Sequence, residues 1–296
     1  DYLGEFDIAM AYYIRALTMK EALGDLAGVA DVYNNIAILY NFHRNYEKAI
    51  DYFKKSLETR KALGDEEGVA ASFNNLGLIH MKLGRFEEAL EYQKESLAIK
   101  ERLGDKRGMT STYNNIGVIY FRMDMPAEAI NFYRKSLKLK KEMGYRAGLA
   151  SSYLNIGEAF MALEQYKKAN AQLDSALLYA QQTKNKDDLR LIYKVFAELK
   201  ATLNDYKAAY KYQRRYTTLN DSIFSEQSAE KIAELQALYE LERKEKELEL
   251  QKLKTESEIF NRNVFLIGFL IIVVLVFAVI RAYKKVGTTS SIKKAG

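Results

Sequence analysis

The chain has 296 residues, a net charge of +6 and 28% charged residues. It contains no cysteine, which excludes disulfide staples, thiolate metal sites and thiol catalysis. Basic residues are spread along the whole length instead of clustering, so we expect no direct nucleic-acid contact by this segment. A single proline and only 16 glycines favour an all-α protein, because helix interiors reject both residues.

A short motif recurs at a fixed distance of 40 residues. Its copies begin at Tyr33, Phe73, Tyr113, Tyr153 and Tyr193 and read YNNIA, FNNLG, YNNIG, YLNIG and YKVFA. A small residue follows each copy at the same spacing, at Ala49, Ala89, Ala129, Ala169 and Ala209, and one period earlier at Ala9. A period of this size predicts a repeat array, which grows by adding units instead of enlarging one core. We expect half a repeat plus five repeats over residues 1–218, with an N-terminus that looks truncated inside a repeat.

Each unit is predicted to contain two antiparallel helices, and the half repeat is expected to be a helix from about Phe6 to Leu23. In the second full unit, Asp65 is the expected N-cap of the first helix and Gly84 closes that helix. The sequence Leu-Gly-Asp recurs at residues 23–25, 63–65 and 103–105, where glycine ends one helix and aspartate caps the next. The only proline, Pro126, falls in the first turn of a helix, where its missing N–H costs nothing.

The order of residues in each unit resembles the tetratricopeptide repeat: an aromatic, an asparagine, Ile or Leu, Gly or Ala, and then the alanine slot. The period is similar to the long variety of that repeat found in kinesin light chains, polarity adaptors and bacterial quorum-sensing regulators. The resemblance covers residues 1 to about 218. It implies an all-α fold, a right-handed α-solenoid with a concave groove that holds a protein or peptide ligand.

The resemblance also implies which residues face the groove, because the family places the residue before the Leu-Gly pair there. This position and its neighbour give a candidate peptide-binding set of Asn34, Asn35, Asn74, Asn75, Asn114, Asn115 and Asn155. Amide side chains offer a donor and an acceptor, so a row of them can bind the backbone of a partner. The alternative is that these asparagines bridge neighbouring helices. The clamp by which chaperone-type members hold a C-terminal carboxylate is absent, since its slots contain Asn34, Asp31, Ser111 and Ile38.

Two histidines are the residues that an enzymatic interpretation would use first. His80 occupies the slot of Tyr40, Tyr120 and Phe160, and His43 occupies that of Leu83, Met123, Leu163 and Leu203. Both slots are predicted to lie in the core, and neither histidine has metal ligands or a nucleophile at useful spacing. We therefore expect no catalytic residue, no metal site and no cofactor in this segment.

The last unit departs from the pattern, because Tyr216 stands in a slot otherwise filled by alanine or serine and Val195 replaces an asparagine. A bulky Tyr216 can seat the helix that follows, and the alternative is simple sequence drift in an end repeat. Residues 219–260 are expected to form a long charged helix, with i,i+4 pairs at Glu240–Lys244 and Glu242–Lys246. Its apolar seam is interrupted at residues 242–247, so we predict a weak coiled coil and a possible homodimer through residues 222–257. A solvated single helix is the alternative.

The stretch Val264–Ile280 carries no charge or strongly polar side chain, which predicts a transmembrane helix over residues 261–283 and contact with the lipid bilayer. Arg281, Lys284 and Lys285 follow it, so the basic tail at residues 284–296 is expected to be cytoplasmic and to continue beyond Gly296. The repeats are then expected on the periplasmic or extracytoplasmic side of a bacterial inner membrane.

This succession of parts resembles bacterial membrane sensors with tetratricopeptide input domains, in which a histidine kinase or a helix-turn-helix DNA-binding domain follows the span. The resemblance implies a non-catalytic, ligand-binding input region of a single-pass signal transducer. The alternative is a membrane-anchored scaffold with repeats in the cytoplasm. A periplasmic enzyme is a third reading, which the lack of an acid, base and nucleophile constellation disfavours.

Overall fold

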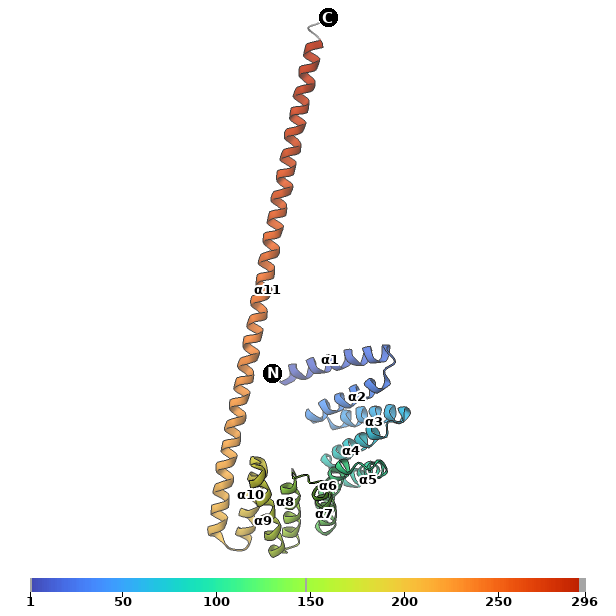
Figure 1. Ribbon diagram of the computed structural model, residues 1–296, viewed down its shortest axis with the longest axis vertical. Helices are drawn as coiled ribbons and strands as arrows, with labels where there is room; N and C mark the ends of the chain where they lie inside the picture. The colour runs from blue at the N-terminus through green and yellow to red at the C-terminus, as the bar shows by residue number, and fades with distance from the viewer. Residues whose placement is uncertain (1, 147, 293–296) are drawn as a thin grey trace. The chain divides into compact units, whose positions relative to one another are not determined.

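The computed structural model describes residues 2–146 and 148–292; at residues 2–5, at scattered positions from 226 to 268 and beyond residue 270 it describes the backbone alone. Helices joined by short connections make up the described residues, and no strand occurs among them (Figure 1). The predicted all-α class is confirmed for this part of the chain. The chain divides into two units, Asp1–Ser222 and Ile223–Gly296.

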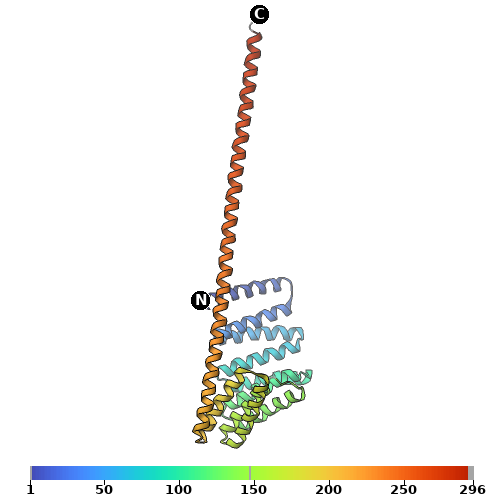
Figure 2. The same cartoon turned by 60° about the vertical axis from the view of Figure 1, so that its left-hand side comes forward.

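Helix pairs build the first unit. The first helices of the pairs are α2 (Leu26–Phe42), α4 (Glu66–Lys82), α6 (Lys106–Arg122), α8 (Leu149–Ala162) and α10 (Lys186–Thr202). The second helices are α3 (Tyr46–Leu63), α5 (Phe86–Leu103), α7 (Pro126–Glu142) and α9 (Tyr166–Thr183), and α1 (Tyr2–Ala22) is the second helix of an earlier pair. From α1 to α10 each helix packs against the next, so the pairs stack in chain order (Figure 2). This is the predicted solenoid.

The helix boundaries follow the predicted capping residues in the first three units. The Oδ1 atoms of Asp25, Asp65 and Asp105 accept hydrogen bonds from the backbone N–H groups of Gly28, Gly68 and Gly108 at 2.8, 2.9 and 2.8 Å. Each bond satisfies one of the amides that the first turn of a helix leaves without a partner. Pro126 is the first residue of α7, as predicted.

The fourth unit breaks this capping pattern. Tyr145 stands where the preceding units have aspartate, and α8 begins only at Leu149. Its N-cap is Gly148, which has a φ of 80° and no capping side chain. The connection before α8 is therefore longer than the connections before α2, α4 and α6.

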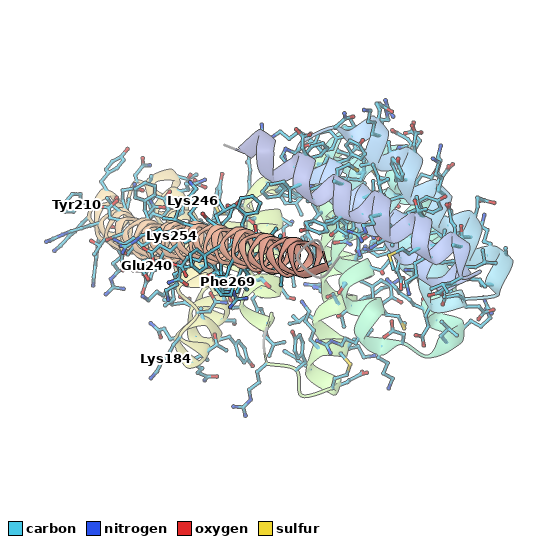
Figure 3. All side chains as sticks on the ribbon, turned by 90° about the horizontal axis from the view of Figure 1, so that it is seen from above. Lys184, Tyr210, Glu240, Lys246, Lys254 and Phe269 are labelled. Atoms are coloured by element: carbon cyan, nitrogen blue, oxygen red, sulfur yellow. The ribbon has the colours of Figure 1, made fainter. Side chains whose placement is uncertain are left out.

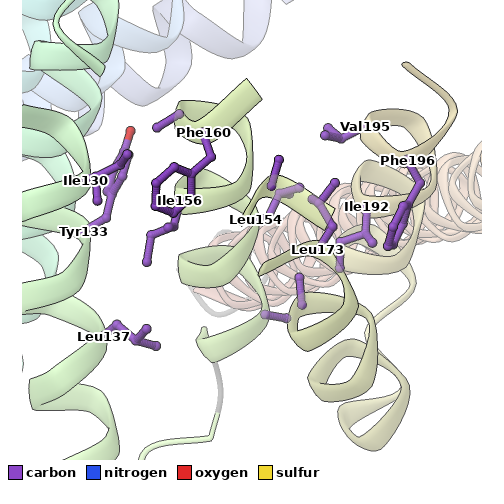
Figure 4. Close-up of a cluster of buried hydrophobic side chains, with 14 of the residues drawn as sticks. Ile130, Tyr133, Leu137, Leu154, Ile156, Phe160, Leu173, Ile192, Val195 and Phe196 are labelled. Atoms are coloured by element: carbon purple, nitrogen blue, oxygen red, sulfur yellow. The ribbon is translucent and has the colours of Figure 1, made fainter. Parts of the chain in front are cut away.

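The repeated small residues allow close packing between the two helices of a pair. A Cβ added to Gly77 or Gly117 would lie 2.6 Å from Gln93 Nε2 or 2.5 Å from the ring of Tyr133, so a larger residue would force these side chains to move. The largest cluster of buried hydrophobic side chains joins α7, α8, α9 and α10 (Figure 4). Among these four helices the core within a pair continues into the interface between pairs, as expected for a solenoid.

The last helix, α11 (Tyr206–Ile292), runs without interruption through three predicted segments. The helix continues through the predicted domain boundaries at 218/219, 260/261 and 283/284. Tyr216, which we expected to seat a separate helix, lies within α11 itself. The physical reason is that residues 206–267 contain no glycine or proline to end the helix.

Side chains on the second part of α11 include Glu240, Lys246, Lys254 and Phe269, which Figure 3 labels. The i,i+4 ion pair seen there joins Arg243 Nε and Glu247 Oε1 at 3.0 Å. The predicted Glu240–Lys244 pair is not among the ion pairs of the described side chains, and the Glu242–Lys246 pair lies outside them. Leu241 and Leu248 are 56% and 53% exposed in the single chain.

A search of the described residues finds no helix that is long and apolar enough to cross a membrane. Most side chains of the predicted span, Val264–Ile280, lie outside those residues.

Candidate functional site

The candidate asparagines lie in the middle of the first helices of the pairs. These helices are neighbours in space as well as in the repeat, because α4 contacts α6 and α8 contacts α10. Equivalent residues of successive repeats therefore form rows across the layer of first helices. Within these rows the asparagines are half-buried, except Asn35, which is exposed.

The structure brings six of the seven asparagines together in pairs. The Nδ2 atom of the second asparagine in one repeat donates to Oδ1 of the first asparagine in the preceding repeat. The pairs are Asn75–Asn34 at 3.1 Å, Asn115–Asn74 at 3.0 Å and Asn155–Asn114 at 3.1 Å. These bonds are what the helix-bridging alternative expects.

The row of pairs ends at the fourth repeat for a chemical reason. The next pair in the series would join residues 154 and 195, which are Leu154 and Val195 and are both buried in the apolar cluster. At the other end, Asn35 is not paired in this way by any described residue. An apolar pair can thus replace an amide pair between the same two kinds of helix.

Pairing leaves part of each amide free for other partners. A carboxamide has two N–H donors and an oxygen with two lone pairs, and each pair uses one donor and one lone pair. The prediction that the asparagines bind a partner is therefore compatible with the pairs, although their hydrogen bonds do not test it.

A polar cavity of about 420 Å³ lies at the last of these pairs. Asn114, Asn115 and Asn155 line it together with the cationic side chains of Arg107 and Lys140. Among the cavities of the described residues, this one combines the predicted asparagines with charged groups. It is therefore the strongest candidate for a binding site.

Lys140 is an unusual member of this cavity because it is only 8% exposed. Its Nζ donates to Ser152 Oγ at 2.8 Å and to the carbonyl oxygen of Gly148 at 3.2 Å. Burial lowers the pKa of Lys140, and the more distant Asp188 raises it in part. The ammonium therefore has neutral oxygen partners, and no ion pair is found for it within the described residues.

The sequence analysis did not select Arg107 or Lys140. The signal that would have found them is the replacement of Asp25, Asp65 and Asp105 by Tyr145 in the fourth repeat. Arg107 lies over the ring of Tyr145, with its Cζ 6.0 Å from the ring centroid. The tyrosine thus supplies a π face where the other repeats supply a carboxylate.

A second cavity, of about 910 Å³, lies in the last repeat and was not anticipated either. Tyr193 and Tyr210 line it with the basic residues Lys207, Lys211 and Arg214. Aromatic and basic residues alternate in this part of α11, and that alternation is the sequence signal for the cavity.

The histidines lie where the repeat register predicts, with one difference. His80 is buried, and its ring centroid lies 5.1 Å from that of Tyr92. His43 is only half-buried and meets the ring of Phe6 edge-on at 4.6 Å. No group of three or more metal-ligating side chains occurs in the part of the chain that the structure describes.

Comparison with known protein families agrees with the repeat pattern. The tetratricopeptide repeat family model matches residues 2–62 and 68–142. No curated protein matches the sequence. Proteins built from such repeats are in general non-catalytic binding scaffolds, which agrees with the predicted class of function.

Solved structures of similar fold cover about three quarters of the chain. BtubC from P. vanneervenii is 17% identical, with a TM-score of 0.66 over 74% of this chain and 92% of that one. A Rap protein in complex with Competence and Sporulation Factor is 13% identical, with a TM-score of 0.57 over 76% and 72%. Aspartyl phosphate phosphatase F from Bacillus subtilis is 14% identical, with a TM-score of 0.59 over 74% and 68%. At these identities the similarity shows the fold alone.

Proposed function

We propose that the repeat array is a binding module for an extended peptide segment of a protein partner, held along the row of asparagine pairs. The observation that carries this proposal is the coincidence of the last asparagine pair with a polar cavity. A Rap protein of similar fold was solved with Competence and Sporulation Factor, so this fold accommodates a bound factor. The fold thus supports protein or peptide partners as the class of ligand.

The asparagine amides suit such a ligand because a peptide backbone presents alternating N–H and C=O groups. In each pair, the accepting residue keeps both N–H groups and the donating residue keeps its oxygen. A row of these groups at the repeat spacing can satisfy a backbone without reading its side chains. Specificity must then come from groups beside the row.

The chain itself supplies the variant that tests the proposal. Replacing Asn74 with Leu and Asn115 with Val copies the natural pair of Leu154 and Val195, so the helices should still pack. A random peptide library displayed on phage is selected against the full chain, and the affinities of selected peptides are then measured for both proteins. We expect the double variant to lose about 1–3 kcal/mol, or roughly 5- to 150-fold in affinity.

Two results would contradict the proposal. One is a library that yields no binding peptide with the wild-type chain. The other is a double variant that folds, as judged by its circular dichroism, and binds the selected peptides as tightly as the wild type. In that case the asparagine pairs serve only to bridge helices.

We further propose that this module is the sensory part of a single-pass membrane protein. The support is the sequence: Val264–Ile280 is apolar and Arg281, Lys284 and Lys285 follow it. The alternative that fits the same observation is a membrane-anchored scaffold with its repeats in the cytoplasm.

Topology separates the two forms of this proposal. Single cysteines introduced on the repeats and in residues 284–296 would be labelled with a membrane-impermeant reagent in intact cells. The sensor form expects labelling of the repeats from outside the cytoplasm, and the scaffold form expects labelling only after lysis. A chain recovered wholly in the soluble fraction would refute both.

A further inference from the structure

Four successive repeats can be compared at two positions. The first holds a cationic residue near the end of a helix, and the second lies five residues later. The cations are Lys20, Arg60, Lys100 and Lys140, and the later residues are Asp25, Asp65, Asp105 and Tyr145. Lys20 Nζ lies 2.6 Å from Asp25 Oδ2, and an Arg60 nitrogen lies 3.5 Å from Asp65 Oδ2. Asp105 acts on Lys100 through its charge and raises the pKa of that lysine, against the larger lowering by burial. Only the fourth cation lacks its aspartate.

The surroundings of the glycine that follows this slot differ between the repeats. In the second and third repeats an aspartate Oδ2 lies directly over Gly68 and Gly108, in contact with the position that a Cβ would take. At Gly148, the equivalent glycine, the nearest atom to that position is Lys140 Nζ at 3.4 Å. The three atoms nearest to that position belong to Lys140 and Ser151, so no carboxylate oxygen is among them.

Lys140 and Gly148 both line the 420 Å³ cavity, whose lining contains cations and neutral polar groups and no described acidic side chain. Two of the three N–H groups of Lys140 are used by Gly148 and Ser152, which leaves one. The guanidinium of Arg107, the hydroxyl of Ser111 and the Nδ2 amide of Asn114 add further donors. Asp188 acts on Lys140 through its charge but does not line this cavity. A buried cation whose hydrogen-bond partners are all neutral is costly, and an anion placed here would offset that cost.

We propose that this cavity binds a carboxylate of the partner, which takes the place of the aspartate missing from the fourth repeat. The inference rests on the proposed function in that it names the group by which the bound peptide is recognised. An Asp or Glu side chain would donate no proton and would accept hydrogen bonds from Lys140 and Arg107. The asparagine row would then hold the backbone, and the cavity would select an acidic residue at one position.

The test uses a small probe that does not depend on finding a peptide partner. N-acetylglutamate α-amide, its neutral isostere N-acetylglutamine α-amide, and N-acetylalanine are titrated into the full chain in detergent micelles. The chain has 16 glycines, so selective ¹⁵N-glycine labelling gives a spectrum simple enough to follow Gly148 in the site and Gly108 in the aspartate-containing repeat. The Gly148 signal is assigned with Gly148→Ala.

With the glutamate probe, we expect the amide signal of Gly148 to shift saturably and that of Gly108 to stay in place. The glutamine probe should bind at least about tenfold more weakly, and Tyr145→Asp should show no binding. Tyr145→Asp restores the internal carboxylate of the other repeats, so it should block the probe without loss of fold. Lys140→Gln should abolish the response as well. Binding of N-acetylalanine with equal strength would show that a chain-terminal carboxylate serves as well as an acidic side chain.

The proposal is overturned if the Gly148 signal does not shift, if the glutamate and glutamine probes shift it equally, or if the shift persists in folded Tyr145→Asp. None of these results bears on whether peptides bind along the asparagine row, which the library selection decides separately. Conversely, a failed selection would leave the response of Gly148 to the glutamate probe as an independent measurement of the site.

Discussion

His80 shows at the scale of one residue how a slot in a repeat can be filled at a cost. The neighbouring repeats place Tyr40 and Tyr120 there, whereas His80 is buried and neither of its ring nitrogens has a hydrogen-bond partner among the described groups. Burial lowers the pKa of His80, against smaller opposing effects of Glu88 and Glu47. The neutral ring is therefore favoured in the folded chain.

We expect His80→Tyr to raise the free energy of unfolding by about 1 kcal/mol, because it removes unsatisfied polar atoms from the core. A His80 pKa that folding lowers stabilises the fold fully above the unfolded value of about 6.5 and loses that contribution as the pH falls. Chemical denaturation at pH 7.5 and pH 5.5 should thus show that His80→Tyr loses less free energy of unfolding between the two pH values than the wild type does. Tyr120→His is the matched control and should enlarge the loss; equal pH dependence in all three proteins would contradict the argument.

At the scale of the helix, a second repeated hydrogen bond joins the two layers. The Oγ atoms of Ser56, Ser96 and Ser136 each donate to a backbone oxygen of a first helix, at Ala30, Ala70 and Thr110, and all three distances are 2.8 Å. The same slot holds Ala16 and Ala176 elsewhere in the array. The array therefore tolerates the loss of this bond but gains from it where it is present.

Ser96→Ala should lower the free energy of unfolding by about 0.5–1.5 kcal/mol, since it deletes one buried hydrogen bond and leaves a carbonyl group that already bonds within its helix. Urea denaturation of the full chain measures the change. Ser175→Ala is the control, because Ser175 is only half-buried and its hydrogen bond goes to Ala171 of its own helix. A loss in the control as large as that in Ser96→Ala would show that the effect is general and does not come from the interhelical bond.

Helix-scale features also show what the sequence could and could not predict. The period, the aspartate caps and the place of Pro126 were read correctly because each depends on neighbouring residues. The asparagine pairs were left open between two roles, since their partners lie 41 positions apart and belong to adjacent repeats. The late start of α8 was missed, although the presence of Tyr145 in an aspartate slot indicates that the cap is lost. The uncapped start of α8 and the absence of an aspartate beside Lys140 have the same origin.

At the scale of the whole molecule, the repeats and the predicted membrane segment share one helix. A helix boundary was predicted near residue 218 because the repeat pattern ends there, but the end of a pattern does not end a helix without a residue that breaks it. Continuity of α11 makes the state of its second part, single or paired, the property that decides how this chain associates. The single chain leaves Leu241 and Leu248 more than half exposed, which is compatible with either state.

The coiled-coil prediction can be tested at the interruption of the seam. Glu245 lies four residues after Leu241 and three before Leu248, which is the spacing of one missing core position. Glu245→Leu should therefore strengthen pairing of two chains, whereas Lys244→Leu, with a similar gain in hydrophobicity beside the seam, should not.

Because the chain has no cysteine of its own, single cysteines at Leu241, Leu248 or Arg243 report proximity by disulfide crosslinking in membranes. We expect partial crosslinking at Leu241 and Leu248, little at Arg243, and near-complete crosslinking at Leu248 when Glu245→Leu is added. Absence of crosslinked dimers at every position, with and without Glu245→Leu, would refute the pair and leave α11 as a single solvated helix.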